Sequence, residues 1–308
     1  MAAMVGLLAK FVVGYTGLVV LLYALSAMGV ARAGFFARVL ASYMTLALCT
    51  ISGALSSVVL TLAGQQQIAQ WFAGRVFHHA MVRTTGVRFV VDDANHVLET
   101  TRPAVFVGNH QTELDVLMLA AMFPRYCSVT AKSDLRHVPL LGWFMRLSGS
   151  IFIDRRSSHD AREAMRGAAQ EIKAKRQSVY MFPEGTRSYA KEPMLLPFKK
   201  GAFHLAIQAG VPIVPCVVAN YSHILYAKDM VFTSGTIPIK VLDPIPTEGL
   251  TSADVEDLAR KTRDIMLDQL IMLSAQAKGQ PIISTASSPS LPSTKATSTG
   301  IDTPASSL

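Results

Sequence analysis

Two long apolar segments near the start of the chain constrain its fold more than any other feature. Residues 11–31 contain no charged residue until the linker begins, and residues 39–64 are likewise free of charge. At about 1.5 Å per helical residue the first segment covers roughly 30 Å, the thickness of one hydrocarbon core, and the second is also long enough to span it. We expect a short linker with Arg32 and Arg38 between them. The sequence therefore predicts an N-terminal pair of hydrophobic membrane helices.

The arrangement of this pair in a membrane stays open. Either both segments span the bilayer, or they form a hairpin within one leaflet. Positive charge does not decide, because Arg32 and Arg38 compete with Arg75, Arg83 and Arg88. A cleavable signal peptide is the alternative for the first segment. Its apolar run is longer than the usual core of about 7–15 residues and a second run follows, which argues against cleavage.

Composition agrees with partial immersion in lipid. The chain is 50% hydrophobic and only 16% charged, against about 25% charged residues in typical soluble domains. Its net charge of +8 suits a negatively charged partner, and charge alone does not choose among an anionic lipid, a phosphorylated small molecule and nucleic acid. Cys49, Cys127 and Cys216 are scattered without C-x-x-C spacing, so neither a disulfide framework nor a zinc site is indicated.

After about residue 65 the pattern changes to short apolar runs that alternate with amphipathic stretches. Runs rich in β-branched residues predict strands at 105–108, 128–131, 151–153, 179–182, 213–219 and 237–242. Helical spacing predicts a helix over 160–175, and a long helix after Thr251 with Val255, Leu258, Ile265 and Met272 on one side. Strands alternating with helices predict an α/β fold, a mixed sheet flanked by helices.

These patterns divide the chain into three parts. Residues 1–75 form the membrane-anchoring helix pair, and residues 76–275 form the folded domain. Residues 276–308 are rich in Ser, Thr and Pro with few aromatic residues, so we expect this tail to be disordered.

The first candidate site is the sequence Asn-His-Gln-Thr-Glu-Leu-Asp at 109–115, directly after a predicted strand. On one continuous helix His110 and Asp115 would lie about 140° apart and could not pair. They can pair if His110 sits in the turn after the strand and Asp115 reaches back from the opening of the next helix. Asp115 would then hold the imidazole in one tautomer, and His110 could take a proton from a hydroxyl. The alternative is a surface histidine with a helix-capping aspartate.

The second candidate is Phe-Pro-Glu-Gly-Thr-Arg-Ser at 182–188, also after a predicted strand. Pro and Gly force a sharp turn. Arg187 offers a planar fork that suits phosphate oxygens, and Glu184 can orient that arginine. The alternative is an ordinary turn with a solvated ion pair.

Further basic residues follow the other predicted strands. Lys132 follows the strand at 128–131, and Arg155 follows the strand at 151–153. If the four strands are parallel neighbours, His110, Lys132, Arg155 and Arg187 converge on one edge of the sheet. Solvated side chains at unrelated strand ends are the alternative.

In order and spacing these motifs resemble those of the glycerolipid acyltransferases, specifically the 1-acyl-sn-glycerol-3-phosphate acyltransferases. The resemblance covers residues 105–215, where 211–215 matches a fourth block, together with the apolar N-terminal pair. It implies that His110 is the catalytic base and Asp115 its orienting partner. It further implies a substrate-binding set made of Lys132, Arg155, Glu184, Gly185, Thr186 and Arg187.

The resemblance also implies the reaction. An acyl group would pass from acyl-CoA to the sn-2 hydroxyl of 1-acyl-sn-glycerol 3-phosphate (lysophosphatidic acid), giving phosphatidic acid in phospholipid biosynthesis. Acyl-CoA is a co-substrate, and we expect no cofactor and no metal. The lipid bilayer is the expected partner, in the endoplasmic reticulum of a eukaryote or the inner membrane of a bacterium. Glycerol 3-phosphate or another lysophospholipid is the alternative acceptor.

Two other classes compete with an acyltransferase. A hydrolase with Ser, His and Asp lacks support because the chain contains no G-x-S-x-G sequence. A membrane scaffold or a nucleic-acid-binding protein would explain the net charge but not the motifs at strand ends. Because basic and aromatic residues are not clustered as in RNA-binding modules, we expect no nucleic-acid partner.

Overall fold

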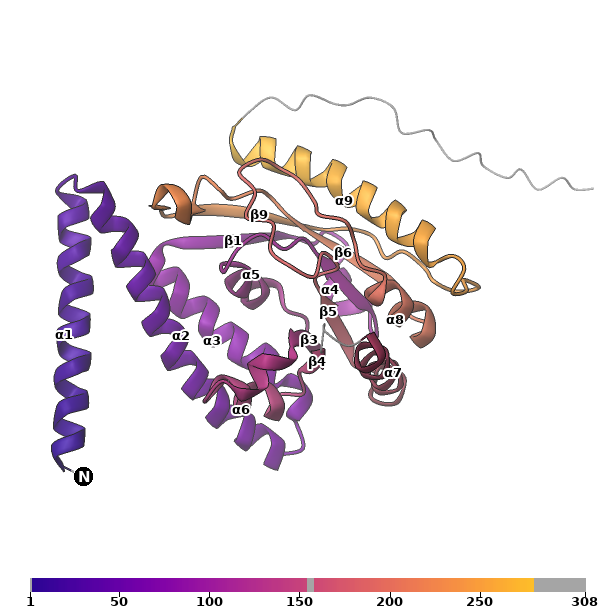
Figure 1. Cartoon of the computed structure of the whole chain (residues 1–308), viewed down its shortest axis with the longest axis horizontal. Helices are drawn as coiled ribbons and strands as arrows, with labels where there is room; N and C mark the ends of the chain where they lie inside the picture. Colours follow the sequence, from indigo (N-terminus) through magenta and orange to yellow (C-terminus); the bar gives the residue numbers. More distant parts are fainter. Residues whose placement is uncertain (1, 154–157, 280–308) are drawn as a thin grey trace, which may run out of the picture.

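Two long helices open the structure, a computed structural model that describes residues 2–153 and 158–279. Helix α1 covers Ala2–Ala27 and helix α2 covers Ala31–Leu62. The predicted pair of apolar helices is therefore present, and each is long and apolar enough to cross a membrane. Figure 1 shows α1 standing apart at one side, whereas α2 runs diagonally alongside the rest of the molecule.

The position predicted for the linker between these helices is wrong. Arg32 and Arg38 both lie inside α2, and the chain turns before them, at residues 28–30. Helix α2 tolerates Arg38 because the guanidinium donates hydrogen bonds to the carbonyl oxygens of Thr85 (3.0 Å) and Phe232 (3.2 Å). Those partners come from distant parts of the chain, so the apolar pattern alone placed the helix start too late.

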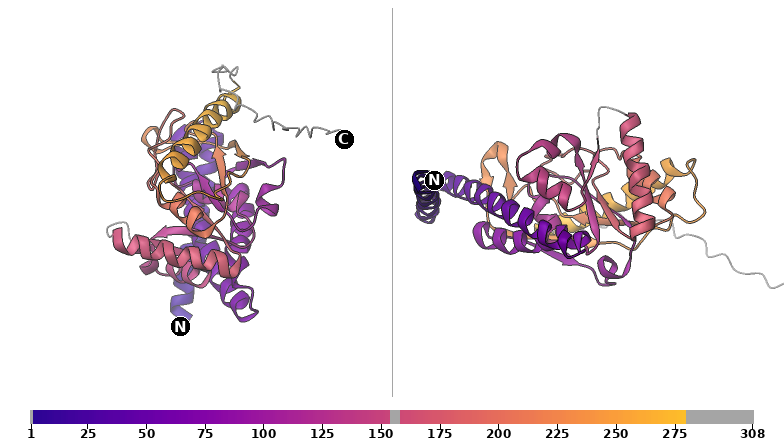
Figure 2. Two further views of the ribbon diagram at one scale, coloured as in Figure 1. Left: turned by 90° about the vertical axis from the view of Figure 1, so that its right-hand side faces the viewer. Right: turned by 90° about the horizontal axis from the view of Figure 1, so that it is seen from below.

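Helix α2 joins the apolar pair to the domain. It packs against α3 (Ala69–Thr85) and α6 (Leu141–Leu147). Its most apolar stretch is 17% buried, whereas none of the corresponding stretch of α1 is buried. Helix α3 also crosses the boundary predicted between residues 75 and 76. The second view of Figure 2 shows α1 and the start of α2 at one end of the molecule.

Seven strands form one mixed sheet in the order β1-β9-β6-β2-β5-β3-β4. Their bounds are β1 Val87–Asp92, β2 Val105–Gly108, β3 Cys127–Lys132, β4 Ile151–Ile153, β5 Ser178–Met181, β6 Ile213–Val218 and β9 Gly235–Val241. β6 pairs parallel with β2 and antiparallel with β9, so the predicted mixed sheet is confirmed. Strand β1 and the small hairpin of β7 (Leu225–Tyr226) and β8 (Val231–Phe232) were not predicted.

The four strands that precede the candidate site residues are parallel neighbours in the sheet, as a shared site requires. β2, β5, β3 and β4 pair parallel with one another in that order. Their carboxyl ends therefore meet at one edge of the sheet. Because open α/β sheets usually bind ligands at that edge, the residues that follow these strands are the candidates for chemistry.

Helices cover both faces of the sheet and complete two apolar cores. The remaining helices are α4 Val97–Thr100, α5 Asp115–Met122, α7 Ser158–Lys175, α8 Gly201–Ala209 and α9 Val255–Ala277, with short 3₁₀ turns at Gln66–Ile68, Ser133–His137 and Ala227–Asp229. Phe106 packs in the core that includes residues of α5. Val105 and Val107 point to the opposite face and pack with residues of α7, α8 and α9.

The buried face of α9 differs from the predicted one. Val255 and Leu258 are buried as expected, but Ile265 and Met272 are exposed by 49% and 38%. The buried residues further along are Met266, Leu270, Leu273 and Ser274. Leu258, Ile265 and Met272 are each seven residues apart. A straight helix drifts by about 20° per seven residues, so the buried face moves forward by one position toward the end of a 23-residue helix.

Candidate active site

His110 and Asp115 form a dyad at the carboxyl end of β2. His110 lies in the turn after the strand, and Asp115 is the first residue of α5. The Nδ1 atom of His110 lies 2.7 Å from Oδ2 of Asp115, so the predicted contact between these side chains is present. The His110 side chain is 18% exposed, while Asp115 is 2% exposed. A buried carboxylate thus braces an imidazole that solvent and substrate can reach.

The hydrogen bonds around Asp115 fix the tautomer of His110. Oδ2 of Asp115 also accepts the backbone N–H groups of Gln111 (2.6 Å) and Thr112 (3.1 Å). Because this oxygen is surrounded by donors, Nδ1 of His110 must carry the proton and donate it as well. Nε2 then keeps its lone pair. It has no hydrogen-bond partner in the part of the chain that the structure describes, and it is the atom that can accept a proton.

Tyr221 completes the surroundings of the carboxylate and was missed by the sequence analysis. Its hydroxyl lies 2.7 Å from Oδ1 of Asp115, and the residue is fully buried. Burial, together with the charge of Asp115, raises the pKa of Tyr221 well above its usual value. The hydroxyl therefore stays protonated and donates to the carboxylate. Tyr221 follows β6, so the signal that could have found it is its place just beyond a central strand.

The ring of Phe182 packs against the face of the His110 imidazole. The two rings are stacked, with centroids 4.0 Å apart and planes inclined by 16°. Phe182 directly follows β5, the neighbour of β2 in the sheet. Because of this stacking, the ring of His110 can rotate only within its own plane. The hydrogen bond to Asp115 fixes that rotation. The orientation of Nε2 is therefore set by two independent contacts.

The prediction that Glu184 orients Arg187 is wrong. Oε1 of Glu184 accepts the backbone N–H of His110 (2.7 Å), and Oε2 accepts the backbone N–H of Leu196 (2.9 Å). Burial raises the pKa of Glu184, although these two hydrogen bonds favour its charged form. With both oxygens turned toward backbone donors, the carboxylate does not face the arginine. Its role is to anchor the backbone of the histidine turn.

Arg187 instead pairs with Glu113, a residue of the histidine motif. Nη1 of Arg187 lies 3.0 Å from Oε1 of Glu113 and 3.2 Å from the Tyr189 hydroxyl. Burial lowers the pKa of Arg187, but the hydrogen bond to Tyr189 and the charge of Glu113 outweigh it and hold that pKa above its usual value. The Nε atom is buried and has no partner among the described residues. The guanidinium therefore stays charged, and its side chain is 36% exposed, so a ligand can reach it.

The turn at 182–188 is tied to the histidine turn by its backbone. Ser188 N–H donates to the carbonyl of His110 (2.9 Å), which brings Arg187 next to the dyad. Gly185 adopts φ +70°, a left-handed conformation that favours glycine. Thr186 is exposed beside it. The glycine thus permits the sharp turn that returns the chain toward His110.

Lys132, another predicted cation, does not join this cluster. Lys132 ends β3, is half exposed and pairs with Asp134 at 2.5 Å. Lys132 does not contact the dyad, because β5 lies between β3 and β2 in the sheet. Arg155 lies outside the described residues. The structure therefore brings together His110, Asp115 and Glu184, with Arg187 beside them.

No group of three or more His, Cys, Asp or Glu side chains that could hold a metal ion occurs within residues 2–153 and 158–279. Cys127 and Cys216 are buried free thiols. Burial raises the pKa of Cys216 above its usual range. A thiol of that kind is a poor nucleophile, so the reactive groups of this edge are the imidazole and the arginine.

The α/β domain brings a histidine, a buried carboxylate and an arginine together at one sheet edge, an arrangement that fits an acyltransferase. Residues 88–219 match the family model described as Acyltransferase. The chain is 41% identical over 236 residues to the 1-acyl-sn-glycerol-3-phosphate acyltransferase of Saccharomyces cerevisiae, a match that covers 77% of each chain. It therefore belongs to the 1-acyl-sn-glycerol-3-phosphate acyltransferase family.

Two further comparisons agree with this assignment. The human 1-acyl-sn-glycerol-3-phosphate acyltransferase alpha is 42% identical over 194 residues, which cover 63% of this chain and 68% of the human one. The crystal structure of the 1-acyl-sn-glycerophosphate acyltransferase PlsC from Thermotoga maritima superposes with a TM-score of 0.63. At 21% identity, covering 77% of this chain and 95% of that one, it shows a shared fold.

Proposed function

We propose that this protein transfers an acyl group from acyl-CoA to the sn-2 hydroxyl of 1-acyl-sn-glycerol 3-phosphate and forms phosphatidic acid. Membership of the family supports this reaction. The observation that carries the proposed mechanism is the dyad. Asp115 fixes the ring of His110 through Nδ1, and Nε2 has no hydrogen-bond partner among the described residues. A base prepared in this way suits the deprotonation of an alcohol.

In the proposed mechanism the acceptor hydroxyl attacks the thioester directly. Nε2 of His110 takes the hydroxyl proton as the oxygen bonds to the thioester carbonyl carbon. The tetrahedral intermediate collapses with cleavage of the C–S bond, and the imidazolium returns its proton to the thiolate of CoA. Asp115 stabilises the imidazolium between these steps. The described residues place no Ser or Cys side chain in hydrogen-bond contact with Nε2, which favours direct transfer over a covalent acyl-enzyme.

Arg187 is the proposed ligand of the acceptor phosphate. Its side chain is 36% exposed beside the dyad, so a phosphate oxygen can reach the exposed N–H groups of the guanidinium. Glu184 acts indirectly, since it holds the backbone of His110 in place. Lys132 and Arg155 remain proposed phosphate contacts, with Gly185 and Thr186 shaping the turn of the substrate-binding set. Holding the phosphate places the sn-2 hydroxyl near the base.

The two apolar helices associate the protein with a membrane. We propose that residues 1–75 anchor it, that 76–275 form the acyltransferase domain, and that 276–308 are a tail. Lysophosphatidic acid and the product are both lipids, so a domain held at the bilayer surface meets its acceptor there. We further propose the endoplasmic reticulum membrane in a eukaryote, or the inner membrane in a bacterium, as its location.

A panel of acceptors tests the proposed reaction. Purified protein in detergent micelles is given one acyl-CoA with lysophosphatidic acid, glycerol 3-phosphate or lysophosphatidylcholine. We expect phosphatidic acid from the first acceptor and little product from the others. In Arg187→Ala the KM for lysophosphatidic acid should rise more than the KM for acyl-CoA. An unchanged acceptor KM would remove Arg187 from phosphate binding and leave the reaction itself unaffected.

A further inference from the structure

A cavity of about 700 Å³ opens at the sheet edge opposite the dyad. It is lined by residues that precede β2 and β3 and by Ser178, the first residue of β5. His110 lies two residues beyond the end of β2, so the four-residue strand separates the dyad from the cavity by about 13 Å at 3.3 Å per residue. The volume lies in the range of about 300–1,000 Å³ that is typical of small-molecule sites.

Three arginines line this cavity. Arg75 comes from α3, Arg102 precedes β2 and Arg125 precedes β3. Among the described residues none of the three forms an ion pair with a carboxylate. Arg75 donates to the carbonyls at the end of α5, and burial lowers its pKa. Three uncompensated guanidinium groups around one hollow create a local excess of positive charge.

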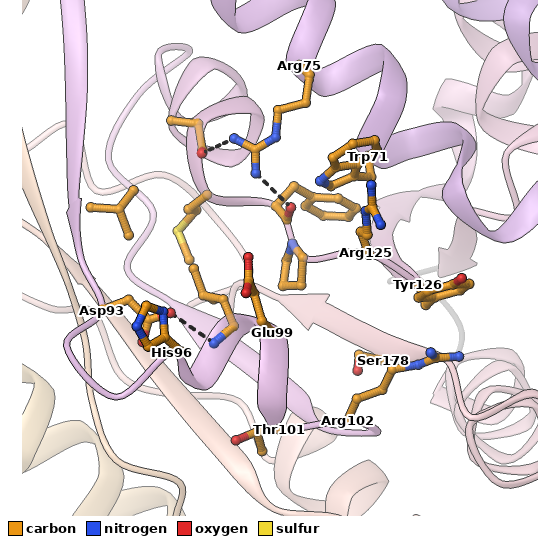
Figure 3. A pocket seen from close by; sticks show the side chains of 16 residues that line it. Trp71, Arg75, Asp93, His96, Glu99, Thr101, Arg102, Arg125, Tyr126 and Ser178 are labelled. Atoms are coloured by element: carbon orange, nitrogen blue, oxygen red, sulfur yellow. Dashed lines mark hydrogen bonds between the residues drawn. The ribbon is translucent and has the colours of Figure 1, made fainter.

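All three arginines lie over aromatic rings, a contact that uses the flat face of the guanidinium rather than its N–H groups. Nε of Arg102 donates to a backbone carbonyl (2.7 Å), so its terminal N–H groups are the ones left for a ligand. The guanidinium of Arg125 lies 4.4 Å from the ring centroid of Trp71, and that of Arg102 lies 3.7 Å from the ring centroid of Tyr126. Figure 3 shows Arg75, Trp71 and Arg125 together on one side of the cavity. Stacking restricts a guanidinium without using its donors, so less conformational entropy is lost when an anion binds.

The acidic groups of the cavity do not cancel this charge. Both carboxylate oxygens of Asp93 accept backbone N–H groups, from Val97 (2.8 Å) and Leu98 (3.0 Å). Asp93 is therefore turned toward the start of α4. Glu99 is exposed and lines the cavity (Figure 3), without an ion pair to a described residue. It can accept a hydrogen bond from a hydroxyl or ammonium group carried by the same ligand.

We propose that this cavity binds a phosphate ester, held by Arg75, Arg102 and Arg125. Arginine edges recognise phosphate oxygens with two parallel hydrogen bonds, and three of them around one cavity suit a dianion. The phosphate belongs either to a soluble phosphomonoester or to the headgroup of an anionic phospholipid. This second site does not depend on the acyl transfer proposed above.

The chain carries its own reporter for this test. It has two tryptophans, Trp71 in the cavity wall and Trp143 exposed on α6. In the full-length Trp143→Phe protein in neutral detergent, all tryptophan fluorescence comes from Trp71. Inorganic phosphate and glycerol 3-phosphate are titrated at constant ionic strength, with sodium chloride as the comparison. We expect a saturable change in Trp71 emission with phosphate and none with chloride.

Substitutions decide where the response arises. Arg125→Gln and Arg102→Gln should each weaken the apparent affinity by at least about tenfold, since each removes charged hydrogen bonds to the ligand. Arg83→Gln, an exposed arginine on the same helix α3 as Trp71, should leave the affinity unchanged. Arg187→Gln separates this site from the catalytic one and should also have no effect. A response abolished by Arg187→Gln, or retained in full by Arg125→Gln, would overturn the proposal.

A lipid arm distinguishes the two sources of phosphate. The same Trp143→Phe protein is mixed with phosphatidylcholine vesicles that either contain or lack about 20 mol% phosphatidic acid. This anionic lipid gives the vesicle a negative surface potential. A response that requires phosphatidic acid and is lost in Arg125→Gln identifies a lipid headgroup. A response to the soluble esters alone identifies a soluble ligand. Absence of a saturable response in both arms contradicts the site.

Discussion

Replacing Asp115 by Asn removes the charge of the dyad while keeping its shape. Three donors converge on Oδ2 of Asp115, so the side-chain carbonyl of Asn should keep that position and its NH₂ group should face Tyr221. The Tyr221 hydroxyl can rotate to accept from it. His110 therefore keeps its tautomer and loses only the stabilisation of its protonated form.

The size of the loss follows from the geometry. With Nδ1 and Oδ2 2.7 Å apart, the two charge centres lie about 4 Å from each other. At an effective dielectric constant of about 20 their attraction is about 4 kcal/mol. Since about 1.4 kcal/mol corresponds to a factor of ten in rate, kcat/KM in Asp115→Asn should fall by about 10³-fold.

The assay follows CoA release from acyl-CoA in the presence of lysophosphatidic acid, with thermal unfolding in the same detergent to confirm that the variant is folded. Asp229→Asn is the matched control, because Asp229 is half exposed and pairs with the exposed Lys191. It should keep wild-type activity. If folded Asp115→Asn retains more than about a tenth of kcat/KM, the carboxylate does not stabilise an imidazolium and the reasoning is refuted.

Three further substitutions test the surroundings of the dyad. Tyr221→Phe leaves Oδ1 of Asp115 without its donor in a buried place, so thermal or urea unfolding should show a loss of about 1–3 kcal/mol. Glu113→Gln frees Arg187 from its carboxylate partner, and initial rates should show a KM for lysophosphatidic acid lower by about twofold to fivefold. Gly185→Ala places a side chain at φ +70°, so unfolding should show a loss of about 1–2 kcal/mol.

Each of these variants has a control within the chain. Tyr226→Phe removes a hydroxyl that is not bonded to Asp115, so stability should change little. Glu192→Gln removes an exposed carboxylate away from Arg187 and should leave the acceptor KM unchanged. Gly167→Ala adds a methyl group in open space within α7 and should stabilise the helix by about 0.5–1 kcal/mol. A rise in acceptor KM for Glu113→Gln would contradict the competition of Glu113 for Arg187. Unchanged stability of Tyr221→Phe or Gly185→Ala would contradict the role given to the hydroxyl or to the glycine.

The sequence predicted the dyad because its geometry is local. His110 and Asp115 are five residues apart, and only a turn after a strand brings them together. The central strands were predicted closely for a similar reason, since fully buried parallel strands are short apolar runs such as residues 105–108. Strand β1 was missed because its sequence, Val-Arg-Phe-Val-Val-Asp, alternates apolar and polar residues weakly, although buried and exposed positions alternate along it.

The partners of the site residues could not be predicted because they depend on long-range packing. Tyr221 lies 106 positions from Asp115, so no local pattern joins them. The sequence indicated Glu184 as the partner of Arg187, whereas the backbone bond from Ser188 to His110 places the arginine beside Glu113. The start of α2 was misplaced for the same kind of reason, since distant carbonyls satisfy Arg38.

The central claim is that one imidazole removes the proton from the acceptor hydroxyl. Its most direct test is the rate of phosphatidic acid formation from acyl-CoA and lysophosphatidic acid by wild type and by His110→Ala, purified in the same detergent. A positioned base contributes about 10²–10⁴-fold, so the variant should remain folded and lose at least about 100-fold in kcat. A folded His110→Ala protein that turns over at a rate close to wild type would contradict the account.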